Sequence, residues 1–248
     1  ITTGWGTYTG REATEIIGFT APTREGYTIA TDDAGNNIWY KLNADNTVDE
    51  TVTWVEGYYA TAETNGLTFV PAWEGIPYTV NYYVDDEGGE LWDTEEVVYG
   101  ETLNGPFYEV EKTGYKFVEW QDAEGNVYNA NPNDDIPDST VPLGGVDLYA
   151  KWEPVEVDFT VVIHYFNKQT NADATTTREL QAYTGSRVEL VETAGPDENV
   201  TYVLWSSLPI VNRGYDFDSE DSRNELFIES VNGDGTSVLN VYYKAMDI

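Results

Sequence analysis

Alternating apolar and polar positions divide this chain into short β-strands. The two clearest strands, Tyr78–Val84 and Phe159–Phe166, are rich in aromatic and β-branched residues. Each is followed by a polar turn and then by a second apolar stretch, at 95–99 and 177–183, which we interpret as the returning strand of a hairpin. No stretch sustains an apolar period of 3.6 residues, so the predicted fold class is mostly β, and α+β at most.

One motif recurs three times along the chain. A Tyr-Gly or Tyr-Thr-Gly is followed by a Gly-Tyr and then by a closing strand that contains an aromatic residue. The Gly-Tyr pairs are Gly26-Tyr27, Gly114-Tyr115 and Gly214-Tyr215, and the closing strands contain Trp73, Trp152 and Tyr243. Self-similarity on this scale predicts a tandem array of three small modules, at residues 1–75, 76–154 and 155–248.

The boundaries between the predicted modules are short and contain proline. Trp73–Pro77 ends the first module, and Trp152–Glu156 ends the second. Proline fixes φ, and so short a linker leaves little freedom. The expected arrangement is an elongated, semi-rigid and monomeric rod, which we interpret as part of a longer chain with neighbouring domains.

The middle segment resembles an internalin-type B repeat, also called the Listeria–Bacteroides repeat. The resemblance extends over residues 7–153 and is best at 78–153. It rests on the opening Tyr78-Thr79-Val80, on Tyr99-Gly100, on Gly114–Trp120 and on the closing Leu148–Trp152. The resemblance implies a small β-grasp-like module of the kind strung along bacterial surface proteins. We expect Trp120 and Trp152 to fill its core, because so thin a module has few other large apolar residues.

The outer segments depart from this pattern. The first is a divergent, N-terminally truncated copy, in which Thr31-Asp32-Asp33 stands where the middle segment has Trp120. The third resembles a mucin-binding-protein (MucBP) repeat, on its opening Val161–Tyr165 stretch and its closing Asn240–Lys244. That resemblance implies a β-grasp-like surface module as well.

Charge narrows the range of partners. The chain carries 45 acidic and 12 basic residues, a formal net charge of −33, and the acidic residues are spread over all three segments. Nothing here could neutralise the phosphates of a nucleic acid, and attraction to anionic lipids is disfavoured. No apolar run is long enough to span a bilayer, so membrane insertion is not expected. Like-charged modules repel one another and remain soluble.

Catalytic chemistry finds no support in the sequence. The chain has no cysteine and one histidine, His164, which lies in the middle of a predicted strand. No nucleophile motif or phosphate-binding loop is present. Carboxylates are so abundant that a glycosidase-like pair cannot be argued from spacing, so we consider a hydrolase only to reject it. We predict a protein that is not an enzyme and has no cofactor.

The one candidate metal site is an acidic stretch in the third segment. Asp216, Asp218 and Glu220 alternate along the chain and could place oxygens around Ca²⁺. The stretch lacks the EF-hand pattern, and a solvated acidic loop is the simpler interpretation.

Surplus aromatic residues are the one feature that could support ligand binding. Aromatic side chains stack on sugar rings, and neighbouring carboxylates accept hydroxyl protons. The first segment is richest in them, and its candidate glycan-binding residues are Trp39, Tyr40, Trp54, Tyr58 and Tyr59. Core filling and strand propensity explain the same residues without a ligand.

Two functions remain open from the sequence. The first is a non-catalytic extracellular stalk or adhesin segment of a bacterial cell-surface protein, wall-anchored or secreted, that spaces or presents a binding head. The alternative is a carbohydrate-binding module in a surface or secreted glycan-degrading system. Its partner would be a host glycoprotein such as mucin, or a dietary polysaccharide.

Overall fold

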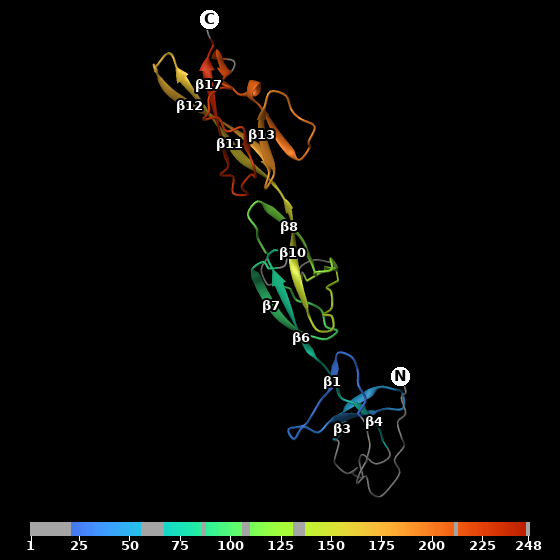
Figure 1. Cartoon of the computed structure of the whole chain (residues 1–248). Coiled ribbons are helices and arrows are strands. Elements are labelled where there is room, and N and C mark those ends of the chain that lie inside the picture. Colours follow the sequence, from blue (N-terminus) through green and yellow to red (C-terminus); the bar gives the residue numbers. More distant parts are fainter. Residues whose placement is uncertain are drawn as a thin grey trace. The chain divides into compact units, whose positions relative to one another are not determined.

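Strands make up nearly all of the regular structure. The computed structural model describes residues 21–55, 67–85, 88–105, 110–130, 137–210 and 213–246. Among these residues the one helix is a single 3-10 turn, Trp205–Ser207, and the mostly-β prediction is confirmed. By contacts the chain divides into two compact units (Figure 1): unit 1 comprises 1–82, 93–107 and 128–148, and unit 2 comprises 83–92, 108–127 and 149–248. The predicted division into three modules remains a prediction.

The N-terminal segment, in unit 1, has two small antiparallel sheets. Strand β1 (Tyr27–Ile29) pairs with β5 (Trp73–Gly75). Strand β2 (Ile38–Leu42) lies between β3 (Val48–Val55) and β4 (Thr68–Pro71). These strands are rich in the β-branched and aromatic residues that favour extended backbone.

The middle segment contributes one five-stranded sheet. Its strands are β6 (Pro77–Tyr83), β7 (Leu91–Val98), β8 (Tyr115–Gln121), β9 (Val127–Tyr128) and β10 (Val146–Pro154). Their order is β7-β6-β10-β8-β9, so the first and last strands of the segment are neighbours at the centre. This order is in keeping with the β-grasp-like module that the resemblance implies.

The two motif tryptophans of the middle segment differ in burial. Trp120, on β8, is 5% exposed, as expected of a core residue. Trp152, on β10, is only half-buried, and its indole nitrogen donates a hydrogen bond of 2.6 Å to the Val84 carbonyl. The core prediction is therefore confirmed for Trp120 but is wrong for Trp152, because its indole reaches a backbone acceptor at the margin of the sheet.

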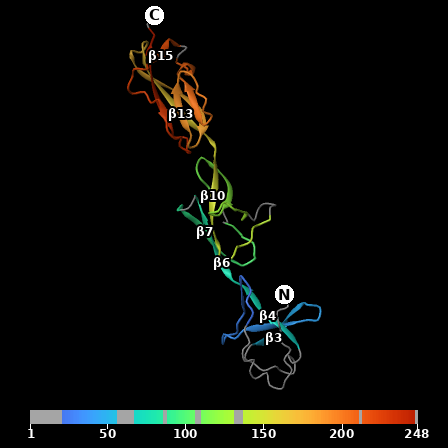
Figure 2. The same ribbon diagram turned by 45° about the vertical axis from the view of Figure 1, so that its right-hand side comes forward.

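The C-terminal segment, in unit 2, begins with a four-stranded sheet. Strands β11 (Glu156–Asn167), β12 (Ala172–Tyr183), β15 (Tyr215–Phe217) and β17 (Val238–Ala245) lie in the order β12-β11-β17-β15. Strands β11 and β12 form the predicted hairpin, and β11 and β17 are parallel. Figures 1 and 2 show β10 leading directly into β11.

A second sheet completes the C-terminal segment. Strand β13 (Arg187–Val191) pairs in parallel with β14 (Val200–Leu204) and antiparallel with β16 (Phe227–Ile228). Alternate side chains of β11 and β17, such as Val161, Ile163 and Val241, are fully buried in the core together with residues of β13 and β14. The alternation that the sequence shows thus gives a sheet with one buried face.

The three copies of the sequence motif adopt one arrangement. In each, the strand after a glycine pairs antiparallel with the closing strand, and the tyrosine lies opposite the last residue of that strand. The partners are Tyr27 with Gly75, Tyr115 with Pro154, and Tyr215 with Ala245. Two residues after each tyrosine, Ile29 pairs with Trp73, Phe117 with Trp152, and Phe217 with Tyr243. The sequence repeat is therefore also a structural repeat.

The first two copies also share a turn that the motif did not include. Asp32 accepts backbone hydrogen bonds from Ala34 and Asn36, and Asp122 accepts the same bonds from Glu124 and Asn126. Both stretches read Asp-x-x-Gly-Asn. The first copy thus keeps the turn, although it lacks the tryptophan.

Candidate functional site: the glycine–tyrosine joints

The first motif pair contacts the start of the middle segment. We call this contact the first joint; it consists of Gly26, Tyr27, Ile76, Tyr99 and Gly100, all in unit 1. The Ile76 amide donates to the Gly26 carbonyl at 2.9 Å, and the Tyr99 amide donates to the Ile76 carbonyl at 3.0 Å. Ile76, the residue between β5 and β6, is therefore held on both sides by backbone hydrogen bonds.

Aromatic packing closes the first joint. The Tyr99 ring packs edge-on against Tyr27, at 5.6 Å between centroids, and against Tyr78, at 6.2 Å. Gly26 has a φ of +77°, and a β-carbon there would overlap the Tyr99 ring. Glycine is required at this position for two reasons: the positive φ and the close approach of the Tyr99 ring.

The second joint has the same two backbone hydrogen bonds as the first. It consists of Gly114, Tyr115, Val155, Thr184 and Gly185, all in unit 2. The Val155 amide donates to the Gly114 carbonyl at 3.0 Å, and the Thr184 amide donates to the Val155 carbonyl at 3.0 Å. Val155 thus corresponds to Ile76, and Thr184 corresponds to Tyr99.

The atoms that crowd Gly114 differ in kind from those that crowd Gly26. At a φ of +80°, a β-carbon on Gly114 would overlap the backbone of Gly233 and the Thr184 hydroxyl. The Thr184 hydroxyl also donates to the Val155 carbonyl at 3.2 Å. Backbone and a small polar side chain replace the aromatic cluster of the first joint.

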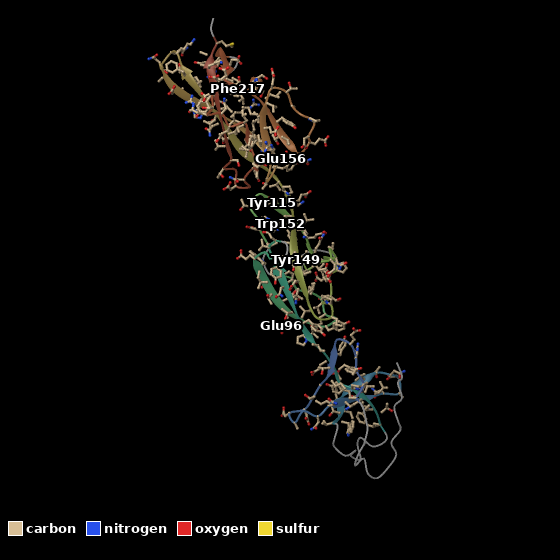
Figure 3. The ribbon with its side chains drawn as sticks, in the orientation of Figure 1. Glu96, Tyr115, Tyr149, Trp152, Glu156 and Phe217 are labelled. Carbon is tan, nitrogen blue, oxygen red and sulfur yellow. The ribbon has the colours of Figure 1, made fainter. Side chains whose placement is uncertain are left out.

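A cation covers the tyrosine of each joint. The Arg24 guanidinium lies 3.7 Å from the Tyr27 ring centroid, and the Lys112 ammonium lies 4.8 Å from that of Tyr115. Lys112 also forms an ion pair with Asp85 and lies 5.9 Å from the Trp152 ring. Figure 3 shows Trp152, Tyr115 and Glu156 in succession along unit 2. Such cation–π contacts strengthen as water is excluded.

These contacts change the interpretation of the motif. The sequence showed the Gly-Tyr and Tyr-Gly pairs only as parts of a recurring motif. The structure shows that a Gly-Tyr pair and the x-Gly turn that follows it in the chain meet across a one-residue link between strands. The recurrence of a Gly-Tyr pair and an x-Gly pair in each segment was the sequence signal that pointed to these positions.

The glycan-binding candidates of the first segment do not form one open surface. Trp39 is 1% exposed and lies opposite Trp54 in the β2–β3 pair, with ring centroids 6.1 Å apart. A sugar cannot stack on so buried a ring, so Trp39 is removed from the candidate site. Trp54 is half-buried, with its ring 6.3 Å from that of Phe69, and Tyr40 is half-buried too. Tyr58 and Tyr59 lie outside the described residues.

The acidic stretch of the third segment does not form a ligand set. Asp216 accepts a hydrogen bond from the Phe217 amide, and Asp218 forms an ion pair of 3.3 Å with Lys244. Within the described ranges, no group of three or more His, Cys, Asp or Glu side chains is placed to hold a metal ion. The structure therefore does not bring Asp216, Asp218 and Glu220 together around a cation.

The single histidine lies within a stack of polar rings. His164 stacks on Tyr242 at 4.4 Å between centroids, and its Nε2 is 2.9 Å from the Asn240 side-chain oxygen. The Arg223 guanidinium lies 4.1 Å from the Tyr242 centroid and is paired with Asp221. Hydrogen bonds from Arg223 lower the pKa of the Asp221 carboxyl to about 2. These contacts are those of a side chain on a sheet face, as the sequence predicted.

Hydrogen bonding also lowers the pKa of the two turn aspartates. The Asn36 backbone and side chain hold the pKa of Asp32 below its usual value, and the Asn126 side chain does the same for Asp122. Hydrogen bonds to an ionised carboxylate favour the charged form. Both turns are therefore stabilised by ionised carboxylates at neutral pH.

The described residues thus form one strand pairing three times, and a glycine contact accompanies it at the first and second joints. Residues 78–151 match the Listeria-Bacteroides repeat domain, so the middle segment is a repeat of this family. This domain is found in bacterial surface proteins. No curated protein matches the chain. No helix in the described parts of the chain is long and apolar enough to cross a membrane.

Proposed function

We propose that this protein is a non-catalytic spacer segment of a bacterial cell-surface protein, which holds a binding head at a fixed distance from the cell. The main support for this proposal is that two successive links, at Ile76 and Val155, have the same backbone hydrogen bonds. Each link residue is bound through both its amide and its carbonyl. A spacer must resist bending at its links, and such hydrogen bonds supply the resistance.

The surrounding residues support the same role. Each link consists of a single residue between two strands, as at Gly75–Pro77 and Pro154–Glu156. The glycine of each joint allows an approach that any other residue would block. A charge of −33 disfavours association between copies and keeps such a segment hydrated. The family of the middle repeat fits an extracellular location.

A distance measurement between spin labels tests the spacer role. The chain has no cysteine, so Ala34→Cys and Gln169→Cys, both at exposed turn positions, label it at two unique sites. A spacer predicts one narrow distance distribution between the labels. A broad distribution in dilute buffer would contradict the proposal, because it would mean that the links are free hinges.

A pair of glycine variants shows whether the joints cause the narrow distribution. Gly114→Ala should broaden it, because a β-carbon there overlaps Gly233. Gly125→Ala is the matched control: its φ of +84° is close to that of Gly114, but nothing lies within 4 Å of its β-carbon position. The control should leave the distribution narrow.

The extracellular location needs its own experiment. Antibodies raised against the purified chain should bind intact cells of the source bacterium, and surface proteolysis should remove the signal. Binding that requires cell lysis would contradict a surface role.

Carbohydrate binding is the second candidate, and it rests on Tyr40 and Trp54. The contacts of Trp54 with Trp39 and Phe69 favour packing over binding. Affinity electrophoresis in gels that contain mucin, starch or plant polysaccharides tests it. Retardation that Trp54→Ala abolishes, with the fold retained, would favour this candidate, and no retardation by any glycan would exclude these glycans as ligands.

A further inference from the structure

The third Gly-Tyr pair, Gly214-Tyr215, forms the same backbone hydrogen bond as the glycines of the two joints. The link amide donates to the glycine carbonyl in all three copies: Ile76 to Gly26 at 2.9 Å, Val155 to Gly114 at 3.0 Å, and Met246 to Gly214 at 2.9 Å. The φ angles of the three glycines are +77°, +80° and +84°. Met246 therefore occupies the position that the link residues Ile76 and Val155 occupy.

The third pair differs in what covers it. A β-carbon on Gly26 or Gly114 would overlap neighbouring atoms, whereas no atom of the described residues lies within 4 Å of that position on Gly214. The Met246 side chain is 43% exposed, whereas Ile76 and Val155 are half-buried. Within the described part of the chain, no backbone amide donates to the Met246 carbonyl. The backbone hydrogen bond of the joint is thus formed, and none of the described residues covers Gly214.

We propose that Gly214, Tyr215 and Met246 form a docking face for a further β module that continues the chain beyond this segment. The occupant is defined by the two filled joints, where a Tyr99-Gly100 or Thr184-Gly185 turn packs on the Gly-Tyr pair. In both, the turn glycine has a positive φ. Its β-carbon position would be in van der Waals contact with the hydroxyl of the joint's tyrosine, at 3.5 Å for Gly100 and 3.4 Å for Gly185. The docked module therefore carries a turn that ends in such a glycine.

Tyr215 shows how the open face differs from the filled ones. Its hydroxyl donates to the Phe166 carbonyl at 3.1 Å, and its ring packs edge-on against Tyr165 at 5.1 Å. These contacts hold the Tyr215 ring against β11, and no described residue covers Gly214. The position that Arg24 and Lys112 occupy, three residues before the tyrosine, is Asn212 in this copy. We therefore expect docking here to rely on the backbone and on Gly214 rather than on a cation.

This inference rests on the spacer proposal, because it treats the joint as the means by which modules are added. The test uses the full chain followed by a second copy of residues 79–154, so that Ile248 takes the place of Tyr78. The added copy carries Glu101→Asp, at an exposed position, so that its peptide is distinguished by mass. Hydrogen exchange is then measured at the added Tyr99–Gly100 turn.

Docking predicts that the added Tyr99 amide exchanges at least tenfold more slowly in the extended chain than in its Gly214→Ala variant. Gly35→Ala, with a φ of +83° and nothing within 4 Å, should leave this exchange unchanged. In the unextended chain the two variants should lower the melting temperature equally, because both then suffer only backbone strain.

Two results would overturn the proposal. In the first, the strands of the added copy are protected from exchange, which shows that it is folded, but its Tyr99 amide exchanges at the same rate with and without Gly214→Ala. The other is protection of residues 213–217 in the unextended chain that rises with protein concentration, since the occupant would then be a second copy. A narrow distance distribution between the labels at positions 34 and 169 would leave the spacer proposal standing in either case.

Discussion

The first and second joints share a backbone and differ in the side chains that close it. At the first, the rings of Tyr27, Tyr78 and Tyr99 pack on one another. At the second, Thr184 replaces Tyr99, and the backbone of Gly233 fills the space near Gly114. The comparison teaches that the glycine and the two link hydrogen bonds define the joint, whereas its filling can be aromatic or polar.

This difference also decides how each joint responds to a substitution. A ring can rotate away from an added methyl group, but the turn that contains Gly233 cannot move without disturbing the strands β16 and β17 that it joins. We therefore expect the second joint to be the less tolerant of the two. The predictions below are ordered from the largest expected effect to the smallest.

Gly114→Ala should have the largest effect. Overpacking against Gly233 adds to the strain of a positive φ, so we expect a loss of about 4 kcal/mol in the free energy of unfolding. Gly125→Ala, with the same strain and open space, should cost about 1–2 kcal/mol. Chemical denaturation followed by tryptophan fluorescence measures both. Equal losses for the two variants would mean that the approach of Gly233 contributes nothing.

Gly26→Ala should have a smaller effect, and a second substitution should restore part of the loss. Replacing Tyr99 by threonine, the residue at this position in the second joint, removes the ring that the new methyl group would overlap. We expect the double variant Gly26→Ala/Tyr99→Thr to be more stable than the sum of the single losses by about 1 kcal/mol. Strict additivity in the double-mutant cycle would show that the Tyr99 ring does not make Gly26 necessary.

The fold could largely be predicted from the sequence, because its signals are local. Alternation along Phe159–Phe166 predicts the buried side of β11, and the recurrence of the Gly-Tyr pairs predicts the three copies of one strand pairing. Trp120 was correctly predicted to be buried. These features depend on residues that are close in the chain or that recur at matching positions.

The joints and the burial of Trp39 could not be predicted in this way. Nothing in the sequence places Gly233 beside Gly114, since that approach depends on how two turns more than a hundred residues apart are packed. Surplus aromatic content in the first segment indicated a binding surface, but Trp39, on β2, is buried opposite Trp54 of β3. Composition reports how much aromatic surface exists and does not report which face of a sheet it occupies.

Thr184→Val tests the polar filling of the second joint. The substitution keeps the shape and removes the hydroxyl that donates to the Val155 carbonyl. That carbonyl keeps its bond from the Thr184 amide, so we expect a loss of only about 1 kcal/mol in the free energy of unfolding. Thr177→Val, at an exposed position on β12, is the control and should cost nothing. A larger loss for the control would attribute the effect to the added valine itself.

Removing Arg24 or Lys112 should change the free energy of unfolding least, and the effect of added salt should distinguish the two residues. Lys112 contacts Tyr115 and pairs with Asp85, whereas Arg24 lies over Tyr27 at 3.7 Å. Lys112→Met should cost about 0.5–1 kcal/mol in dilute buffer and less in 1 M salt, because partly exposed ion pairs are screened. Arg24→Met keeps apolar contact with the ring and should show a weaker salt dependence. If both losses fell equally with salt, the ion pair to Asp85 would not distinguish the two joints, and the difference between them would reduce to the packing around their glycines.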